Sequence, residues 1–407
     1  MRMVHVVDVG DGACAILRPW PDHGLGPATV IDCGVWRARA KTAADTLLGA
    51  LDGDLSEVES FVVSHFDWDH WGGLRNLEHF PTALNTLYSA TLFYPSMPWR
   101  VPAALYALMG PQTGTGSAAL DLSNSMHPLL RRGETLTLQP LHTGKGTIRL
   151  AGERFDVLWP PQFIDRVFSR RLDGAVKAVE DLAEDLEAAG YPTLKRNLDD
   201  ARSGAATLAD GVEADDGAPP DLGMRIAGDS EAAQFPHEDL DWLDTDGGDD
   251  LPLEEIDAEE ALGARLEHED DDADPDDPDL HQVLGTLPEG FTDRHRRVLR
   301  RIRAANNDLS LVLASRSGRL VAFGDISGFA LRRVLISPRL AGRRFEVMLL
   351  PHHGTHPLPD GMPAARWCVA QGGVHHLPRW QANHPLPHPD AHVCWNTAER
   401  GSLFPGW

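Results

Sequence analysis

The amino-acid sequence predicts an α/β sandwich, in which two sheets pack together with helices outside and a long acidic insertion divides the chain. Three observations support this fold class. Short apolar runs typical of buried strands alternate with stretches of helical spacing. Potential metal ligands follow several of these runs directly. A stretch rich in aspartate and glutamate separates two blocks of such elements.

The block boundaries predict three parts. Residues 1–162 are expected to form the first half of the sandwich, residues 163–305 an acidic insertion, and residues 306–407 the second half. The chain has 407 residues. Without the insertion, enough chain remains for one sandwich with a sizeable core.

Apolar runs and turn residues place the elements of the first half in order. The runs predict strands near residues 3–9, 13–18, 28–32, 61–63, 86–94, 134–141, 147–151 and 154–159. Helical spacing predicts helices near residues 38–51, 73–79, 101–109 and 118–131.

The second half follows the same pattern. Its apolar runs predict strands near residues 309–315, 319–324, 345–350 and 366–370. Helices are expected near residues 328–336 and 389–400. Two such sheets would place polar residues that follow the strands on loops along one edge of the sandwich.

The insertion has three sections. Phe163 to Ala189 has helical spacing with apolar residues along one side, which predicts an amphipathic helix on the body. Ala201 to Asp279 consists of Gly, Ala, Pro and acidic runs, so it is expected to be flexible in large part. Arg294 to Arg303 predicts a basic helix that leads back to the body.

Four potential metal ligands follow the apolar run at 61–63, namely His65, Asp67, Asp69 and His70. Residues i and i+2 that leave a strand point to one side, so the first two can share a cation. The following turn would bring the other two to a second cation. Two cations about 3.5–4 Å apart can activate a water and stabilise charge on a phosphoryl or acyl oxygen. The alternative is a surface turn that is only rich in His and Asp.

Glycines and later strand ends fit the same interpretation. Gly72 and Gly73 would allow a tight turn into a helix whose N-terminus faces the site. Asp325 ends an apolar run and could bridge two metals, while a second run leads into His352 and His353. Each of these two patterns alone is weak evidence for a metal ligand. Because both follow the motif at 65–70 in the chain, the three together predict a metal site more strongly.

These motifs resemble the metallo-β-lactamase superfamily, and within it the ComEC-type metallo-hydrolase domain of competence proteins. The likeness spans roughly 260 of the 407 residues, in two blocks. The motifs that carry it are 7–12, 30–34, 65–70, 307–325, 352–354, 383–385 and 388–389. The resemblance implies a metallo-β-lactamase αββα sandwich. Asp67 stands where most of the superfamily has histidine, which is similar to the ComEC group.

The resemblance also implies a ligand set. His65 and Asp67 would bind metal one, and Asp69 and His70 metal two, with Asp325 as the bridge. His353 would complete metal two in preference to His352, because a small residue, Gly354, follows it.

Two departures from the ComEC pattern concern the N-terminus and metal one. The ComEC group has Gly-Gln-Gly-Asp where this chain has Gly10-Asp11-Gly12-Ala13. The role of the aspartate that ends the group's pattern is therefore either missing here or supplied by Asp11. A third histidine for metal one has no clear counterpart. His142 and His388 are the candidates, the first read as a surface histidine and the second as a ligand, a substrate contact or a helix-start residue.

The expected cofactors are two divalent ions. A carboxylate in place of imidazole makes site one harder, which leaves zinc and manganese both open. The candidate catalytic residues are Asp69, together with His356 or His388, which would stabilise or protonate the leaving oxygen. Trp68 and Trp71 could stack on a base or form apolar walls.

Charge is spread unevenly. The net charge is −24, but residues 171–290 alone carry 37 acidic and 7 basic side chains, a net of −30, which leaves +6 for the rest. A mildly basic body is compatible with a DNA substrate. The acidic segment could mimic a polyanion and cover a basic cleft, dock a protein partner, or act only as a solubilising linker.

The first functional hypothesis is therefore a phosphodiesterase or nuclease acting on DNA. The alternatives are a hydrolase of small esters, phosphoesters or lactones, and a regulatory subunit of a defence or DNA-processing complex that keeps the fold without turnover. No run of 18 or more apolar residues and no signal-like N-terminus is found, so a cytoplasmic protein without membrane contact is expected. Its four cysteines show no metal-ligand spacing and are expected to be reduced core residues.

Overall fold

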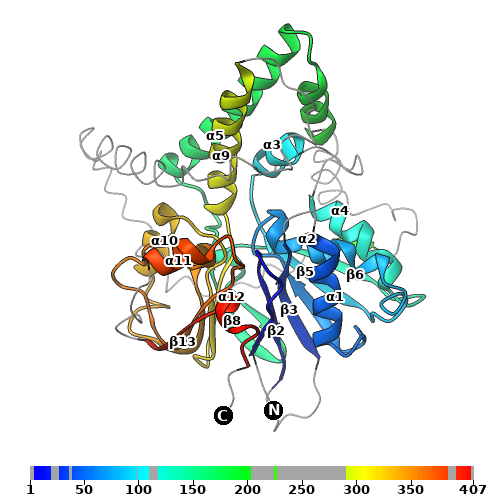
Figure 1. The fold of residues 1–407 in the computed structure, drawn as a ribbon, viewed down its shortest axis with the longest axis vertical. Coiled ribbons are helices and arrows are strands. Elements are labelled where there is room, and N and C mark those ends of the chain that lie inside the picture. The colour runs from blue at the N-terminus through cyan, green and yellow to red at the C-terminus, as the bar shows by residue number, and fades with distance from the viewer. Residues whose placement is uncertain are drawn as a thin grey trace.

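The computed structural model describes residues 4–19, 27–35, 39–98, 100–109, 118–202, 224–226, 290–383 and 391–404. Within these residues, two seven-stranded sheets lie side by side and carry helices on their outer faces (Figure 1). This arrangement confirms the predicted α/β sandwich.

The first sheet has the strand order β1-β2-β3-β4-β5-β6-β9. Its strands are β1 (Val4–Val6), β2 (Cys14–Leu17), β3 (Ala28–Cys33), β4 (Val58–Val62), β5 (Ala90–Pro95), β6 (Leu136–Leu141) and β9 (Met224–Ile226). The strands from β3 to β6 pair in parallel, so their carboxyl ends meet at one edge of the sheet.

The second sheet has the strand order β14-β13-β12-β11-β10-β8-β7. Its strands are β7 (Thr147–Leu150), β8 (Glu153–Trp159), β10 (Val312–Ser315), β11 (Leu320–Ala322), β12 (Arg344–Leu349), β13 (Ala364–Ala370) and β14 (Ala391–Asn396). The strands from β11 to β14 are parallel, so this sheet also gathers carboxyl ends at one edge.

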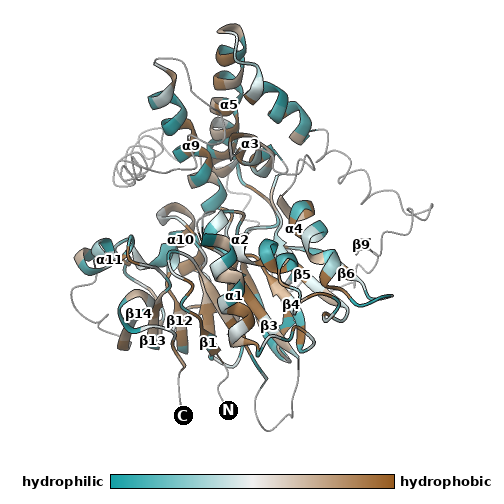
Figure 2. Ribbon diagram, turned by 45° about the vertical axis from the view of Figure 1, so that its right-hand side comes forward, coloured by the Kyte–Doolittle hydropathy of each residue, from teal (hydrophilic) through white to brown (hydrophobic). Residues whose placement is uncertain are grey.

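A hydrophobic cluster from both sheets fills the space between them. Val62 and Phe93 of the first sheet belong to it together with Leu313 and Val347 of the second, and all four are at least 93% buried. Helices cover the outer faces: α1 (Ala40–Ala50), α2 (Trp68–Asn76) and α4 (Ala118–Met126) on the first sheet, and α10 (Gly328–Leu335) and α11 (Leu377–Asn383) on the second. In Figure 2 the strands are largely brown, whereas the helices carry teal outer faces. The binary pattern of the sequence thus sorts the elements into layers.

Three further helices stand above the sandwich (Figure 1): α3 (Arg100–Met109), α5 (Arg166–Ala188) and α9 (Phe291–Asn307). Phe168, Leu172 and Val179 of α5 are buried, as the helical spacing predicts. All three helices share one hydrophobic cluster with strands β10 to β12 and helix α10. The described helices of the insertion therefore pack onto the core of the second half.

The C-terminal segment differs from the expectation. A helix near residues 389–400 was predicted, but residues 391–396 form β14, and only α12 (Thr397–Arg400) is helical. Val393 and Trp395 of β14 pair in parallel with β13. Their β-branched and aromatic side chains fit a pleated sheet better than a helix. The sequence pattern also gave no indication of α11.

Residues 201–279 and the remainder of the insertion up to 289 lie largely outside the described residues, so their expected flexibility stays a prediction. Among the described helices, none combines the length and the apolar character needed to cross a lipid bilayer. Cys14, Cys33 and Cys368 are buried, Cys394 is half-buried, and no disulfide joins these four described residues, which agrees with reduced core cysteines.

Candidate metal centre

The ligand motif lies at the junction of β4 and α2. The strand ends at Val62 and the helix begins at Trp68, so Asp69 and His70 occupy the first helical turn instead of the turn expected before a helix near 73. Asp67 is the N-cap residue with an extended backbone, yet its side chain makes no capping hydrogen bond. Its carboxylate therefore does not cap the helix and is available to bind a cation.

Gly72 and Gly73 do not form the predicted turn, because they lie inside α2. A Cβ atom on Gly73 would come within 2.7 Å of the Cys33 sulfur. A Cβ on Gly34 would come within 2.4 Å of the backbone of Asp69 and His70. These glycines allow α2 to pack directly on β3, which fixes the position of the ligand-bearing turn.

The second half supplies the other side of the site from two loops. Asp325 follows β11, and His352 and His353 follow β12. Both histidines adopt left-handed backbone angles, with φ of 50° and 54°. The His352 backbone nitrogen donates a hydrogen bond to the Gly324 carbonyl at 3.0 Å, which joins the two loops. Strained backbone of this kind is typical of functional sites.

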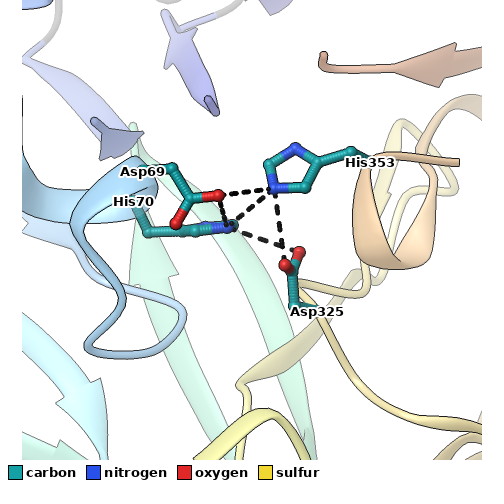
Figure 3. Close-up of side chains that lie close together, drawn as sticks. All are labelled: Asp69, His70, Asp325 and His353. Atoms are coloured by element: carbon teal, nitrogen blue, oxygen red, sulfur yellow. Dashed lines mark hydrogen bonds and ion pairs between the residues drawn. The ribbon is translucent and has the colours of Figure 1, made fainter. Parts of the chain in front are cut away.

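Four side chains from both halves converge on one point (Figure 3). The carboxylates of Asp69 and Asp325 and the imidazoles of His70 and His353 each offer one ligand atom, and these atoms all lie within 4.8 Å of one another. All four residues are buried. The sequence prediction for metal two consists of these same four residues.

The separations of the ligand atoms fit a small cation. His70 Nε2 lies 3.3 Å from His353 Nε2 and 3.3 Å from Asp325 Oδ1. His353 Nε2 lies 3.0 Å from Asp69 Oδ2 and 3.4 Å from Asp325 Oδ2. Ligands about 2.0–2.2 Å from a tetrahedral zinc ion would lie roughly 3.3–3.6 Å apart.

Hydrogen bonds at the opposite ring nitrogens fix the two imidazoles. His70 Nδ1 donates to the carboxylate of Asp32 at 3.0 Å, and His353 Nδ1 donates to the carbonyl of Gln371. When neutral, both rings therefore present Nε2 lone pairs to the site. Four acceptors that face one another in a buried space need a positive charge between them, and this donor set fits a divalent metal.

Protonation replaces that positive charge in the metal-free protein. Burial opposes a charged imidazole, but the neighbouring carboxylates outweigh it and raise the pKa of His353 to about 10. The same balance raises the pKa of His70 well above its ordinary value. Although burial alone would raise them, the pKa values of Asp69 and Asp325 are lowered by the charges of the two histidines.

A second group of donors, His65 and Asp67, lies beside the first and also approaches Asp325. His65 Nε2 lies 3.6 Å from Asp67 Oδ2 and 3.9 Å from Asp325 Oδ2. His65 Nε2 and Asp67 Oδ1 are buried and have no hydrogen-bond partner within the described part of the chain. Because buried polar atoms are normally paired, these two also fit a cation site.

Of the other predicted site residues, those that the structure describes do not belong to the four-residue cluster. The rings of His352 and His356 contact each other edge to face, with centroids 4.4 Å apart, and neither joins the four-residue cluster. His142 caps a short turn by accepting a hydrogen bond from the Gly144 backbone nitrogen at 3.1 Å. His388 lies outside the described residues.

Trp68 and Trp71 are at most 5% exposed and stack on each other with ring centroids 4.8 Å apart. These two rings are therefore packing walls and do not offer a face to a nucleic-acid base. Of the two roles that the sequence leaves open, their burial supports the apolar wall.

Several residues near the centre received no role from the sequence. Asp32 holds His70, and its position at the end of a buried strand matches the signal that identified Asp325. His376 stacks on His353 with ring centroids 4.9 Å apart, and no strand-end pattern marks it. By contrast, the sequence offered Asp11 for the missing N-terminal carboxylate. Asp11 is not part of the four-residue cluster; its carboxylate accepts a hydrogen bond from the His375 backbone nitrogen at 3.0 Å and ties the N-terminal loop to this region.

The fold and the buried cluster are consistent with a metal-dependent hydrolase. Residues 7–158 match the family model described as "Metallo-beta-lactamase superfamily". The match ends at the penultimate residue of β8, so Asp325 and His353 come from the part of the chain beyond it. Comparison with curated proteins finds no match.

Proposed function

We propose that this protein is a phosphodiesterase that acts on DNA through two divalent ions. The observation that carries the proposal is the pair of donor groups that both approach Asp325: His65 with Asp67, and Asp69 with His70 and His353. When bound, such a pair of ions supplies an activated water and stabilises the charge that develops on a phosphoryl oxygen.

The residues divide the work between two sites. His65 and Asp67 would hold the first ion, and Asp69, His70 and His353 the second, with Asp325 shared. Asp67 gives the first site an additional oxygen donor, which favours manganese as well as zinc. His356 or His388 would donate a proton to the leaving oxygen.

Charge is compatible with a polyanionic substrate. Outside residues 171–290 the chain has a net charge of +6, most of it in residues 291–305, so this part of the chain does not repel DNA as a protein of −24 would. The acidic segment is proposed to compete with DNA for this body or to dock a protein partner.

The decisive experiment compares substrates side by side. The purified protein is incubated with Mn²⁺ or Zn²⁺ and with single-stranded DNA, double-stranded DNA, bis-p-nitrophenyl phosphate or a lactone. We expect cleavage of DNA and of the diester, and loss of both in Asp69→Asn. Asp45→Asn, which changes an exposed carboxylate on α1, is the matched control and should keep full activity. Turnover of the lactone alone would exclude the phosphodiesterase.

A further inference from the structure

The buried carboxylate of Asp308 links the first helix of the insertion to the loop that carries Asp325. Asp308 follows α9 directly and is fully buried. One of its carboxylate oxygens accepts a hydrogen bond from Arg171 Nε of α5 at 2.5 Å, and the other accepts from the Ser327 hydroxyl. Its backbone carbonyl accepts from Trp159 Nε1 at 2.6 Å. Asp308 therefore joins elements from three parts of the chain.

Ser327 stands two residues after Asp325, at the N-cap of α10. Serine is favoured at this position because its hydroxyl normally accepts a hydrogen bond from the first helical turn. Here the side chain makes no capping bond and instead donates to Asp308. The hydroxyl thus fixes the short loop that carries Asp325, and it does not stabilise the start of the helix.

The partner of Asp308 on α5 is itself held in place. The Arg171 guanidinium lies over the Phe329 ring, 5.5 Å from its centroid, and that of Arg333 lies 4.3 Å from the same centroid. Arg333 also pairs with Asp165, whose carboxylate caps the N-terminus of α5. The helix is therefore fastened to α10 at two points, one of which reaches the loop of Asp325.

We propose that Arg171 is a positioning residue for the metal centre. It neutralises Asp308, whose other oxygen holds Ser327 and thereby places the Asp325 carboxylate between the two donor groups. This inference rests on the metal centre of the proposed function but not on its substrate. It makes the first helix of the insertion part of the metal site.

The test measures affinity for Zn²⁺ and Mn²⁺ alone, by competition with a chromophoric chelator, in folded protein. Ser327→Ala leaves the pair of Arg171 and Asp308 intact and removes only the link, whereas Arg171→Met removes the positive charge. Outer residues that orient metal ligands typically contribute about 10–100-fold to metal affinity. We expect losses in this range for both variants, and recovery in Ser327→Thr, which keeps the hydroxyl.

Matched controls come from the same elements. Lys177→Met removes an exposed ion pair with Asp181 on α5, and Ser337→Ala removes a hydroxyl just beyond α10; both should bind metal like the wild type. Wild-type affinity in folded Ser327→Ala would overturn the inference, even if Arg171→Met failed to fold. A wild-type protein that binds two ions but cleaves no phosphodiester would refute the proposed function and leave this inference standing.

Discussion

The carboxylate of Asp32 lies 3.0 Å from His70 Nδ1, and its other oxygen accepts a hydrogen bond from the Ser64 backbone nitrogen at 2.7 Å. Asp32 has a left-handed φ of 51°, which Asp and Asn tolerate better than other residues with a side chain. One residue thus orients an imidazole of the cluster and ties β3 to the start of the ligand motif.

Replacing Asp32 by Asn should therefore change the charge behind His70 without straining the backbone. We expect Asp32→Asn to weaken zinc binding by about 10–100-fold, because the carboxylate fixes the tautomer of the ring and raises its basicity. The affinity is measured by chelator competition, with Asp45→Asn as control. Unchanged affinity in Asp32→Asn would show that the contact has no bearing on metal binding.

Gly34→Ala should destabilise the fold at the metal centre. The added methyl group would come within 2.4 Å of the Asp69 carbonyl carbon, so α2 would have to move. Overpacking of this kind costs about 1–3 kcal/mol in the free energy of unfolding. Chemical denaturation measures the loss, and metal content should fall as well.

Gly49→Ala is the matched control for that substitution. Gly49 lies in α1, and an added Cβ atom would meet nothing within 4 Å. Alanine there should raise the free energy of unfolding by about 0.5–1 kcal/mol, because it has the higher helix propensity. Similar effects at both positions would argue against close packing at Gly34.

The metal-free protein should lose stability at alkaline pH. The pKa of His353 rises from an ordinary 6.5 to about 10 in the folded state, so folding favours the protonated ring. This contribution is fully present below pH 6.5 and is lost as pH rises toward 10. Urea denaturation of metal-free protein at pH 6.5 and pH 10 measures the change in the free energy of unfolding. His353→Asn should remove the part of this change that the His353 ring contributes.

Metal binding should show the opposite dependence on pH. Because protons occupy the same imidazole nitrogens, each bound ion must release them, and affinity should increase as pH rises. Isothermal titration with Mn²⁺ in buffers of different ionisation enthalpy counts the released protons. A pH-independent affinity would mean that His70 and His353 are not the ligands.

The acidic segment gives a prediction from charge alone. Removing residues 201–279 and joining the ends through a short Gly-Ser linker should raise DNA cleavage at low salt, since a competing polyanion is lost. The gain should shrink at high salt. A variant with the same length but neutral residues separates charge from chain length. Equal or lower activity in both variants would exclude the hypothesis that the acidic segment mimics a polyanion and competes with DNA.

Much of the fold follows from local sequence signals. The strand runs and the amphipathic spacing of α5 predict the elements well because each buries one continuous face. The structure also brings Asp69 and His353 to 3.0 Å although they are 284 residues apart in sequence. Strand ends that carry ligands made this proximity predictable, since carboxyl ends of parallel strands share an edge.

Other features depend on contacts that no local pattern contains. Gly72 and Gly73 predict a turn, yet the proximity of Trp68 to the first and of Cys33 to the second explains why a helix carries glycines there. The parallel partner β13 determines that residues 391–396 form a strand. Likewise, the pairing of Arg171 with Asp308 joins positions 137 residues apart and follows from no motif.

The donors of the centre come from both sheets, with Asp69 and His70 from the first half and Asp325 and His353 from the second. A bound ion would therefore act as a cross-link across the seam of the sandwich. Because the entropy of loop closure grows only slowly with length, the segment between the halves could lengthen by insertion at a small additional cost. Removal of the ion by a chelator should accordingly weaken the contact between the two sheets before the sheets themselves unfold.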